Sequence, residues 1–351
     1  LAPLALAAYG VTARGNFEGR RTVLRRKVPV SELASQFKLE EREIEGRLET
    51  IRLRLREVRS KRIPPLTDHK QIVAWNGLAI SAFARAGLTL REPVLIERAA
   101  RAAGTILKRG RPRGRLARYL LEGEPHRTGL LDDHAFLIAG LLDLFEATGD
   151  PRWLEEGVAL QRDLDRYFFD DSGGAYYLTP SDGEKLLVRE KPVGDGAVPS
   201  GNSVEAMNLL RLYLLTTDED HRMRAEMTVR AFSEYLARGP TGLGRMLEAV
   251  DFMTDRPKEI LIVTPHSHEE AEPFLLELSR VFLPNRVLVV ARASDLETLA
   301  VGIPLLKHKR AMGGKTTAYV CEDRVCDLPA RDVKTFARQI RADPAPYVRG
   351  R

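Results

Sequence analysis

The feature of the sequence that most constrains the fold is an internal repeat of helical pairs. Three segments that are apolar on nearly all sides each precede a more polar, amphipathic segment, and the apolar ones end at Gly87, Gly149 and Thr217. The six segments are 75–87 with 93–108, 130–149 with 151–169, and 201–217 with 218–238. A helix that is apolar all round must be covered on both flanks. Because the repeat period is longer than that of common solenoids, the pattern predicts helical hairpins that curve into an α/α toroid.

The segments on either side of the repeat have different patterns. Upstream, apolar residues at spacings of three and four predict a long amphipathic helix over 40–62, which ends before Pro64. Downstream of Pro257, three short β-rich runs at 259–263, 286–291 and 317–321 alternate with helical stretches, as in a small α/β unit. We therefore predict a mainly α fold, with an incomplete (α/α)6-toroid-like portion at residues 1–256 and a small C-terminal α/β unit at residues 257–351.

Composition excludes several classes of protein. No apolar run in the 351 residues reaches the roughly 20 that cross a bilayer, so we expect no membrane association. Two cysteines exclude a disulfide-stapled secreted scaffold and indicate a reducing, cytoplasmic location. The net charge is +6, but the basic residues have no recognisable nucleic-acid-reading motif, so we expect a solvated basic surface and no specific nucleic-acid partner. No Gly-rich phosphate loop follows the first two strands, and no cofactor is expected.

Polar residues gather at the starts of all three apolar helices. The clusters are Asp68 with Trp75 and Asn76, then Asp132, Asp133 and His134, and then Asp195, Asn202 and Glu205. Polar residues at helix starts are ordinary caps, and a single histidine or tryptophan there is an ordinary packing residue, so a structural interpretation stays open for each cluster. In a toroid whose inner helices run the same way, however, the starts converge at one mouth. Helix dipoles there favour bound hydroxyl and carboxylate oxygens, so three coincident clusters favour a binding site.

Cys321 and Cys326 form an isolated pair at the end of a predicted strand. Their spacing is compatible with a disulfide, with two structural thiols, or with half of a metal site that His266 and His268 complete. Because the chain has no second cysteine pair and we expect a reducing compartment, we predict that both cysteines are reduced and bind no metal.

One ordered set of motifs runs through almost the whole chain. It consists of Tyr9-Gly-Val-Thr…Gly-Asn-Phe-Glu-Gly19, Asp68-x-Lys70…Trp75-Asn-Gly-Leu78, Leu131-Asp-Asp-x-Ala-Phe136, Gly149-Asp-Pro151, Pro199-Ser-Gly-Asn-Ser203, Phe282-Leu-Pro-Asn285 and Ala318-Tyr-Val-Cys321…Cys326. The set resembles the thioredoxin-plus-six-hairpin family, called YyaL-like in bacteria and spermatogenesis-associated thioredoxin-like in animals. The resemblance implies a thioredoxin-like domain followed by an (α/α)6 toroid similar to N-acylglucosamine 2-epimerases and six-hairpin glycosidases.

Two departures from the family pattern affect the interpretation. We expect this chain to be the C-terminal portion of such a protein, with about three hairpins and without the thioredoxin-like domain. His69 and His134 stand where the family usually has Asp and Tyr, so an imidazole at position 134 is not a family feature. The resemblance therefore implies a fold more strongly than a reaction.

The functional hypothesis is a carbohydrate-active enzyme, a sugar epimerase or a glycoside hydrolase, with a saccharide at the mouth. Asp132 and Asp133 are assigned to act as acid or base with His134 assisting, and Trp75 is assigned to stack on the sugar ring. Hydroxyl binding is assigned to Asp68, Asn76, Asp195, Asn202 and Glu205. The alternative is a non-catalytic binding or redox-partner module that supports a thioredoxin-like domain.

An incomplete ring leaves surfaces uncovered. We expect the apolar faces around Ile80 and Phe83 at one end, and around Met207 and Leu210 at the other, to lack neighbours. A large exposed apolar patch is uncommon on a stable monomer, so we expect self-association.

Overall fold

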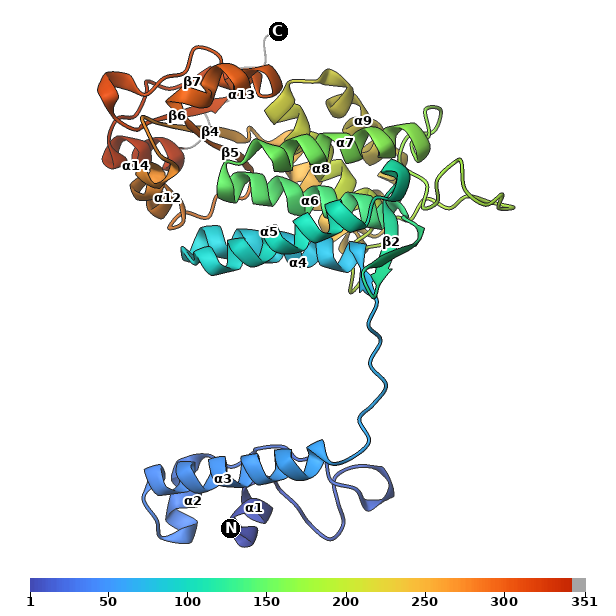
Figure 1. Ribbon diagram of the computed structural model, residues 1–351, viewed down its shortest axis with the longest axis vertical. Helices are drawn as coiled ribbons and strands as arrows, with labels where there is room; N and C mark the ends of the chain where they lie inside the picture. Colours follow the sequence, from blue (N-terminus) through green and yellow to red (C-terminus); the bar gives the residue numbers. More distant parts are fainter. Residues whose placement is uncertain (343–351) are drawn as a thin grey trace. The chain divides into compact units, whose positions relative to one another are not determined.

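The computed structural model describes residues 1–342, and the chain divides after Asp68 into two units (Figure 1). We call Leu1–Asp68 unit 1 and His69–Arg351 unit 2. The sequence placed residues 1–256 in one helical portion. The structure differs, because the first 68 residues have a hydrophobic core of their own. No helix among the described residues is both long and apolar enough to cross a bilayer.

Unit 1 is built from three helices. They are α1 (Ala2–Ala8), α2 (Val30–Phe37) and α3 (Glu41–Ser60). The predicted amphipathic helix is confirmed as α3, whose Ile44, Leu48 and Ile51 lie on one face and pack with Leu4 and Leu33. The other faces of α3 carry the charged residues, as the spacing of its apolar residues requires.

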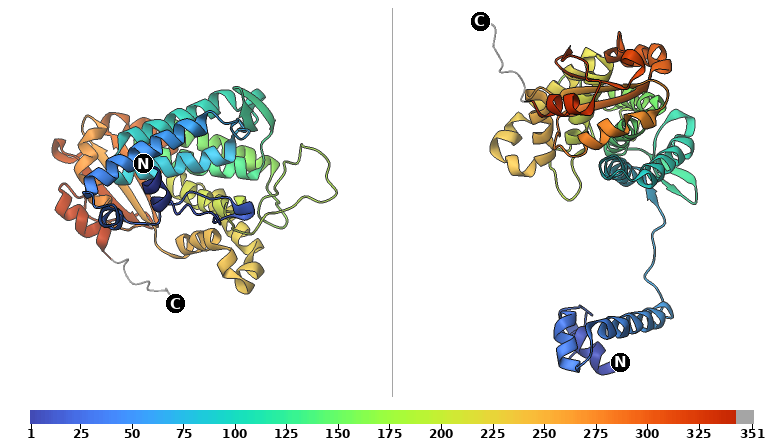
Figure 2. Two further views of the ribbon diagram at one scale, coloured as in Figure 1. Left: turned by 90° about the horizontal axis from the view of Figure 1, so that it is seen from below. Right: turned by 90° about the vertical axis from the view of Figure 1, so that its left-hand side faces the viewer.

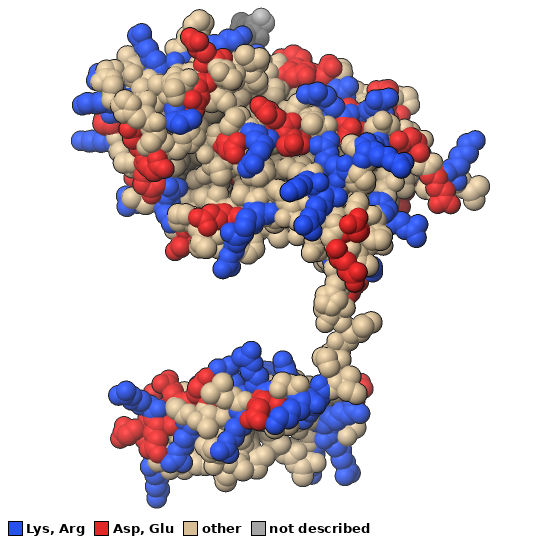
Figure 3. Space-filling model, viewed as in Figure 1, with Lys and Arg blue, Asp and Glu red and all other residues tan. Residues whose placement is uncertain are grey.

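The net charge of the chain resides entirely in unit 1. This unit contains 15 Lys and Arg against 9 Asp and Glu, a net charge of +6, whereas the other 40 basic and 40 acidic residues cancel. Many Lys and Arg side chains stand on the face of unit 1 that Figure 3 shows, interspersed with acidic and uncharged residues. A hollow of about 460 Å³ is lined by Tyr9, Leu24, Leu55, Arg52, Arg56, Arg59 and Arg62. The Arg residues are spread along the chain, but long-range attraction for anions comes from unit 1.

Unit 2 begins with the three predicted helical hairpins. These are α4 (Val73–Leu90) with α5 (Pro93–Arg109), α6 (Leu131–Thr148) with α7 (Pro151–Tyr167), and α8 (Gly201–Thr216) with α9 (Glu219–Ala231). The inner helix α6 packs between α4 and α8, while α5, α7 and α9 cover the outside (Figure 1, Figure 2). A small antiparallel sheet joins β1 (Gln71–Ile72), which precedes the first hairpin, to β2 (Ala117–Leu121) and β3 (Glu124–Thr128), which lie in the chain between the first two hairpins. The predicted mainly α fold of stacked hairpins is thus confirmed.

Two glycines allow the inner helices α4 and α6 to approach closely. A Cβ added at Gly77 would lie 2.5 Å from the backbone carbonyl carbon of Phe136, and one added at Gly140 would lie 2.9 Å from the Gly77 carbonyl oxygen. Side chains at these positions would force the helices apart. The small-residue pattern of the first hairpin therefore reflects contact between helix backbones.

The predicted apolar seam is largely absent. Ile80, Met207 and Leu210 are all buried, and only Phe83 is exposed. The prediction for the α8 side is wrong because α11 (Gly244–Thr254), which follows the short α10 (Ser233–Arg238), packs against α8 and covers it.

The C-terminal part of unit 2 is a mixed α/β layer. Its sheet has the order β5-β4-β6-β7, from β4 (Lys258–Thr264), β5 (Arg286–Arg292), β6 (Thr317–Glu322) and β7 (Val325–Cys326). The helices are α12 (Glu272–Leu278), α13 (Leu296–Gly302) and α14 (Val333–Arg341). β4 and β5 are parallel, whereas β6 is antiparallel to both β4 and β7.

The hairpins and the sheet share one core. On β4, Leu261 and Val263 belong to the same hydrophobic cluster as the inner helices, while Ile260 and Ile262 pack with Phe274 on the opposite face. This alternation is the period of two that a strand imposes. The predicted boundary at residues 256/257 therefore separates two architectures but not two hydrophobic cores.

Candidate functional site

The N-terminal ends of the inner helices lie together at one end of unit 2, which we call the mouth. Asp133 Oδ1 accepts a hydrogen bond from the Ala74 amide at 3.0 Å, which connects α6 to α4. Asp132 Oδ1 lies against Gly201 at the start of α8, where a Cβ would be only 2.4 Å away. Asp195 accepts hydrogen bonds from the amides of Ser200 and Arg245, both at 2.8 Å, which connects α8 to α11.

The Asp133 side chain connects α6 to α4 through hydrogen bonds to backbone amides. Its side chain is fully buried, and besides the Ala74 amide it accepts a hydrogen bond from the Leu130 amide at 2.8 Å. Arg118 Nη1 lies 3.3 Å from its Oδ2. Burial nevertheless raises the pKa of Asp133 to about 6. Because both oxygens are occupied by backbone amides, this carboxyl is placed to hold the helices together rather than to contact a substrate.

Asp132, the next residue, is in a different environment. Its side chain is half-buried, and Oδ1 has no hydrogen-bond partner within the part of the chain that the structure describes. Burial raises the pKa of Asp132, while the Arg118 charge and the nearby Gly201 amide oppose that rise. A carboxyl group with a raised pKa and an unused oxygen at the mouth can accept and return a proton.

The structure does not present His134 at the mouth. Its ring is buried against Phe168, with 5.0 Å between the ring centroids, and Nδ1 pairs with the Leu130 carbonyl oxygen at 2.9 Å. Burial lowers the pKa of His134 to about 4. The imidazole is therefore a neutral core group, and the assisting role assigned to it has no support in this geometry.

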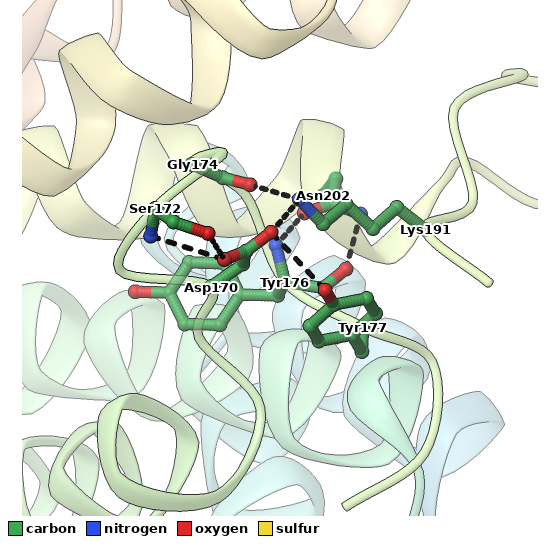
Figure 4. Close-up of polar contacts among 7 residues, drawn as sticks. All are labelled: Asp170, Ser172, Gly174, Tyr176, Tyr177, Lys191 and Asn202. Atoms are coloured by element: carbon green, nitrogen blue, oxygen red, sulfur yellow. Dashed lines mark hydrogen bonds and ion pairs between the residues drawn. The ribbon is translucent and has the colours of Figure 1, made fainter. Parts of the chain in front are cut away.

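Asn202 and Asp195 hold backbone in place. Asn202 accepts a hydrogen bond from the Tyr176 amide at 2.8 Å and donates to the carbonyl oxygens of Tyr176 and Pro192, both at 2.9 Å. Its buried side-chain amide thus pairs with the Tyr176 backbone as a neighbouring strand would, and it also binds the loop at Pro192 (Figure 4). Asp195 makes the amide contacts at the mouth given above. Both side chains are occupied by the protein itself.

A polar cluster that the sequence analysis missed, which we call the latch, lies next to Asn202 and consists of Asp170, Ser172, Gly174, Tyr177 and Lys191 (Figure 4). Lys191 Nζ donates to Asp170 Oδ2 and to the Gly174 carbonyl oxygen, each at 2.6 Å. Ser172 and Tyr177 also donate to the Asp170 carboxylate, and the Lys191 hydrogen bond is the main reason that the pKa of Asp170 lies far below its usual value. The latch closes the base of the loop between α7 and α8. No spacing in the sequence distinguishes these residues from other loop residues.

Glu205 lies inside a buried polar cluster between α7 and α8, away from solvent. Asn208 donates to its Oε2 at 3.1 Å, whereas Oε1 has no hydrogen-bond partner among residues 1–342. Asp165 lies nearby and accepts a hydrogen bond from the Tyr176 hydroxyl at 2.7 Å. Burial, followed by the charge of Asp165, raises the pKa of Glu205 to about 8. Burial thus favours the protonated form of this carboxyl, which does not reach the mouth.

The first predicted cluster is split between the two units. Trp75, in the first turn of α4, is 61% exposed, and Asn76 donates to the Ile72 carbonyl oxygen at 2.8 Å. Asp68 is the last residue of unit 1 and is not placed relative to them. Trp75 and Asn76 thus follow directly on Ala74, whose amide binds Asp133. Arg118, which the sequence analysis had not singled out, lies beside Asp133 and acts on the charge of Asp132.

The prediction that Cys321 and Cys326 are reduced is wrong. Cys321 and Cys326 form a disulfide, because β6 and β7 pair antiparallel with these two residues directly opposite each other. Among the described residues, no three His, Cys, Asp or Glu side chains gather as metal ligands would. His266 and His268 do not complete a site with the cysteines.

Comparison with known proteins gives relatives over most of the chain. No family model matches it. The chain is 33% identical to spermatogenesis-associated protein 20 of Homo sapiens and 31% identical to that of Mus musculus, each over 350 aligned residues. Each alignment covers 94% of this chain but only 44% of the relative, so the chain spans less than half the length of these proteins.

Solved structures with partial similarity are sugar epimerases and a glycoside hydrolase. Cellobiose 2-epimerase from Bacillus thermoamylovorans matches with a TM-score of 0.42 and 13% identity, over 74% of this chain and 66% of that one. The GH76 α-mannanase of Bacteroides thetaiotaomicron matches with a TM-score of 0.40 and 16% identity, over 50% and 46%. The sequence relatives confirm the resemblance drawn from the motifs: the chain is a homologue of spermatogenesis-associated protein 20.

Proposed function

We propose that the mouth of unit 2 binds a saccharide and that Asp132 acts there as the acid and base of a sugar-transforming reaction. One observation carries the proposal. Among the predicted carboxyl groups of unit 2, Asp132 lies at the mouth, and its buried Oδ1 has no hydrogen-bond partner among the described residues. Asp133 and Asp195 are occupied by backbone amides, and Glu205 is buried away from the mouth.

The groups around Asp132 suit a sugar. The exposed indole of Trp75 offers an apolar face on which a pyranose ring can stack, and the ring's C–H groups favour such a surface. Arg118, which is 41% exposed, adds guanidinium donors for hydroxyl oxygens. Together they provide a stacking surface, donors and a proton-transferring group.

The number of available carboxyl groups favours one reaction class. Glycoside hydrolysis uses two carboxyl groups on opposite sides of the scissile bond. Removal of a proton next to a carbonyl and its return on the same face of the enediol, as in an isomerisation, can be served by one group, and here that group is Asp132. An epimerisation with this one group also requires the bound intermediate to turn over, so that the proton returns to its other face. We therefore propose an epimerase- or isomerase-type reaction, with hydrolysis as the second choice.

Intrinsic fluorescence provides the binding test. The chain has two tryptophans, of which Trp75 is exposed and Trp153 is buried, so a sugar at the mouth perturbs the emission of Trp75 alone. Titration with a panel of mono- and disaccharides should give a saturable change that Trp75→Phe abolishes. Phe83→Ala, which removes an exposed aromatic residue two turns further along α4, should leave the change intact. No response to any sugar in the panel would contradict the proposed site.

Turnover is tested separately from binding. Sugars that bind should gain deuterium from D2O when the wild-type protein is present, and Asp132→Asn should stop the exchange while binding persists. Exchange that continues in Asp132→Asn would remove Asp132 from the mechanism. Binding without exchange in the wild-type protein would instead favour the non-catalytic binding module, which the occupied state of Asp133 and His134 supports.

A further inference from the structure

The Cys321–Cys326 disulfide lies among charged groups that the proposed sugar chemistry does not use. Cys321 on β6 is buried in the shared core, whereas Cys326 on β7 is only half-buried. Lys309 Nζ donates a hydrogen bond to Cys326 Sγ at 3.1 Å. The two sulfur atoms are therefore unequal, with one in the core and one beside an ammonium group near the surface.

A carboxyl group lies on the other side of the pair. Glu259 on β4 is directly opposite Cys321 in the antiparallel register of β4 and β6. Side chains at such positions are neighbours on one face of a sheet. Glu259 is buried, its Oε2 has no hydrogen-bond partner within residues 1–342, and burial raises its pKa to about 7. Such a carboxyl can hold a proton at neutral pH and release it nearby.

We propose that Cys321 and Cys326 form a thiol–disulfide exchange centre that accepts two electrons from a dithiol. In the first step, a thiolate of the dithiol attacks Cys326 Sγ, the more accessible sulfur. A new S–S bond forms while the Cys321–Cys326 bond breaks. Cys321 leaves as a thiolate and takes a proton, for which the Glu259 carboxyl is the neighbouring donor.

The second step completes the transfer of two electrons. The other thiolate of the dithiol attacks its own partner sulfur in the mixed disulfide, which forms the dithiol's internal disulfide and releases Cys326 as a thiolate. Lys309 stabilises this thiolate, because a cation next to a sulfur lowers the pKa of its thiol. Two electrons have then passed from the dithiol to the cysteine pair; of the two protons that the dithiol gives up, one restores the Glu259 carboxyl, whose own proton is now on Cys321, and the other passes to solvent while Cys326 remains a thiolate.

Both acidic and basic side chains lie near the cysteine pair. Asp323 and Arg324 form the turn between β6 and β7, and Lys258 forms an ion pair with Glu322 across the neighbouring strands. The direct contact with Cys326 comes from Lys309, whose amine is half-buried. Its removal should therefore have the largest effect on Cys326.

The first experiment measures reduction of the folded chain. Dithiothreitol is added without denaturant, thiols are trapped with N-ethylmaleimide at intervals, and mass spectrometry counts them. We expect two thiols to appear together, with Lys309→Gln slowing the reaction by roughly threefold to tenfold. Lys307→Gln, an exposed lysine two residues away, should react like the wild type. A disulfide that is reduced only after unfolding, or equal rates in both variants, would overturn the proposal.

The second experiment isolates Cys326. In Cys321→Ser, the pH dependence of alkylation by iodoacetamide gives the pKa of the remaining thiol, which should lie below the ordinary value of about 8.5. Adding Lys309→Gln should move it upward, so that alkylation at pH 7 slows severalfold. An unchanged pKa would refute the role of Lys309. If Cys321→Ser does not fold, the reduction rates of the first experiment decide the question.

Discussion

The guanidinium of Arg211 on α8 donates a hydrogen bond to Glu146 Oε1 on α6, with 2.9 Å between the atoms, inside the helical core. The same nitrogen lies 2.8 Å from Asp143 Oδ1, and Ser81 of α4 donates to the other oxygen of Asp143. Burial alone would lower the pKa of Arg211, but the two carboxylates hold it above its usual value. Three inner helices are thus connected through one cation.

Loss of that cation should be severely destabilising. Arg211→Met leaves the carboxylates of Asp143 and Glu146 buried without a counter-charge, and we expect the free energy of unfolding to fall by about 3–5 kcal/mol in urea denaturation. Arg222→Met removes an exposed arginine that pairs with Glu219 and Glu226 on α9, and it should cost less than about 1 kcal/mol. Equal losses in the two variants would contradict the assignment.

The close contact between α4 and α6 predicts opposite effects for two glycines. Gly77→Ala places a methyl group against the backbone of Phe136, so we expect overpacking to cost at least about 1–3 kcal/mol. Gly104→Ala on α5 meets no atom within 4 Å, so it should stabilise the chain by up to about 1 kcal/mol through its better helix propensity. Thermal unfolding of both variants checks this, and a harmless Gly77→Ala would refute the backbone contact.

Asp132 and Asp133 should respond differently to the same substitution. Asp133→Asn converts one acceptor oxygen to a donor, so either the Ala74 or the Leu130 amide loses its partner, at a cost of about 1–3 kcal/mol. Asp132→Asn leaves the Ala74 and Leu130 amides paired and changes only the contact with the Gly201 amide, so it should cost less stability than Asp133→Asn. Denaturant midpoints measured side by side test the distinction. A reversed order would mean that the roles of the two carboxyls are exchanged.

Glu205 should make the stability of unit 2 depend on pH. Its folded pKa of about 8 lies above the ordinary 4.5, so between these values the folded state retains a proton that the unfolded state has lost. Stability therefore falls as pH rises through this window, by up to about 1.4 kcal/mol per unit. Glu205→Gln should remove this component, whereas Glu226→Gln on α9 should not. Parallel pH profiles for wild type and Glu205→Gln would show that Glu205 ionises normally.

The hairpins could be predicted because a helix that is buried on all sides needs apolar residues on all sides, and such a segment can be recognised in the sequence. α6 has no polar residue from Ala135 to Leu142, and the buried residues of its partner α7 recur at the spacings of three and four that mark a half-exposed helix. Helix α11 was missed, although Met246, Ala249 and Phe252 recur at spacings of three, which is a short but readable signal. The antiparallel direction of β6 could not be predicted, since strand periodicity carries no direction.

The position of the candidate site could be predicted from the sequence, but the roles of its individual residues could not. Helices that run the same way bring their first turns together, so the clusters were expected to meet. Asp132 and Asp133 are adjacent and chemically identical, and the positions of the Ala74 and Leu130 amides decide which of them is occupied. The same holds for Asn202, whose pairing with Tyr176 depends on a loop 26 residues away.

The order in which the inner helices pack also bears on synthesis of the chain. α6 docks on α4, α8 docks on α6, and α11 docks on α8, so each hairpin emerging from the ribosome meets a surface that is already present. The sheet is made last, and its Leu261, Val289 and Tyr319 complete the same hydrophobic cluster. Until those strands leave the exit tunnel, the apolar surface that they later cover stays exposed on the growing polypeptide and is prone to aggregate.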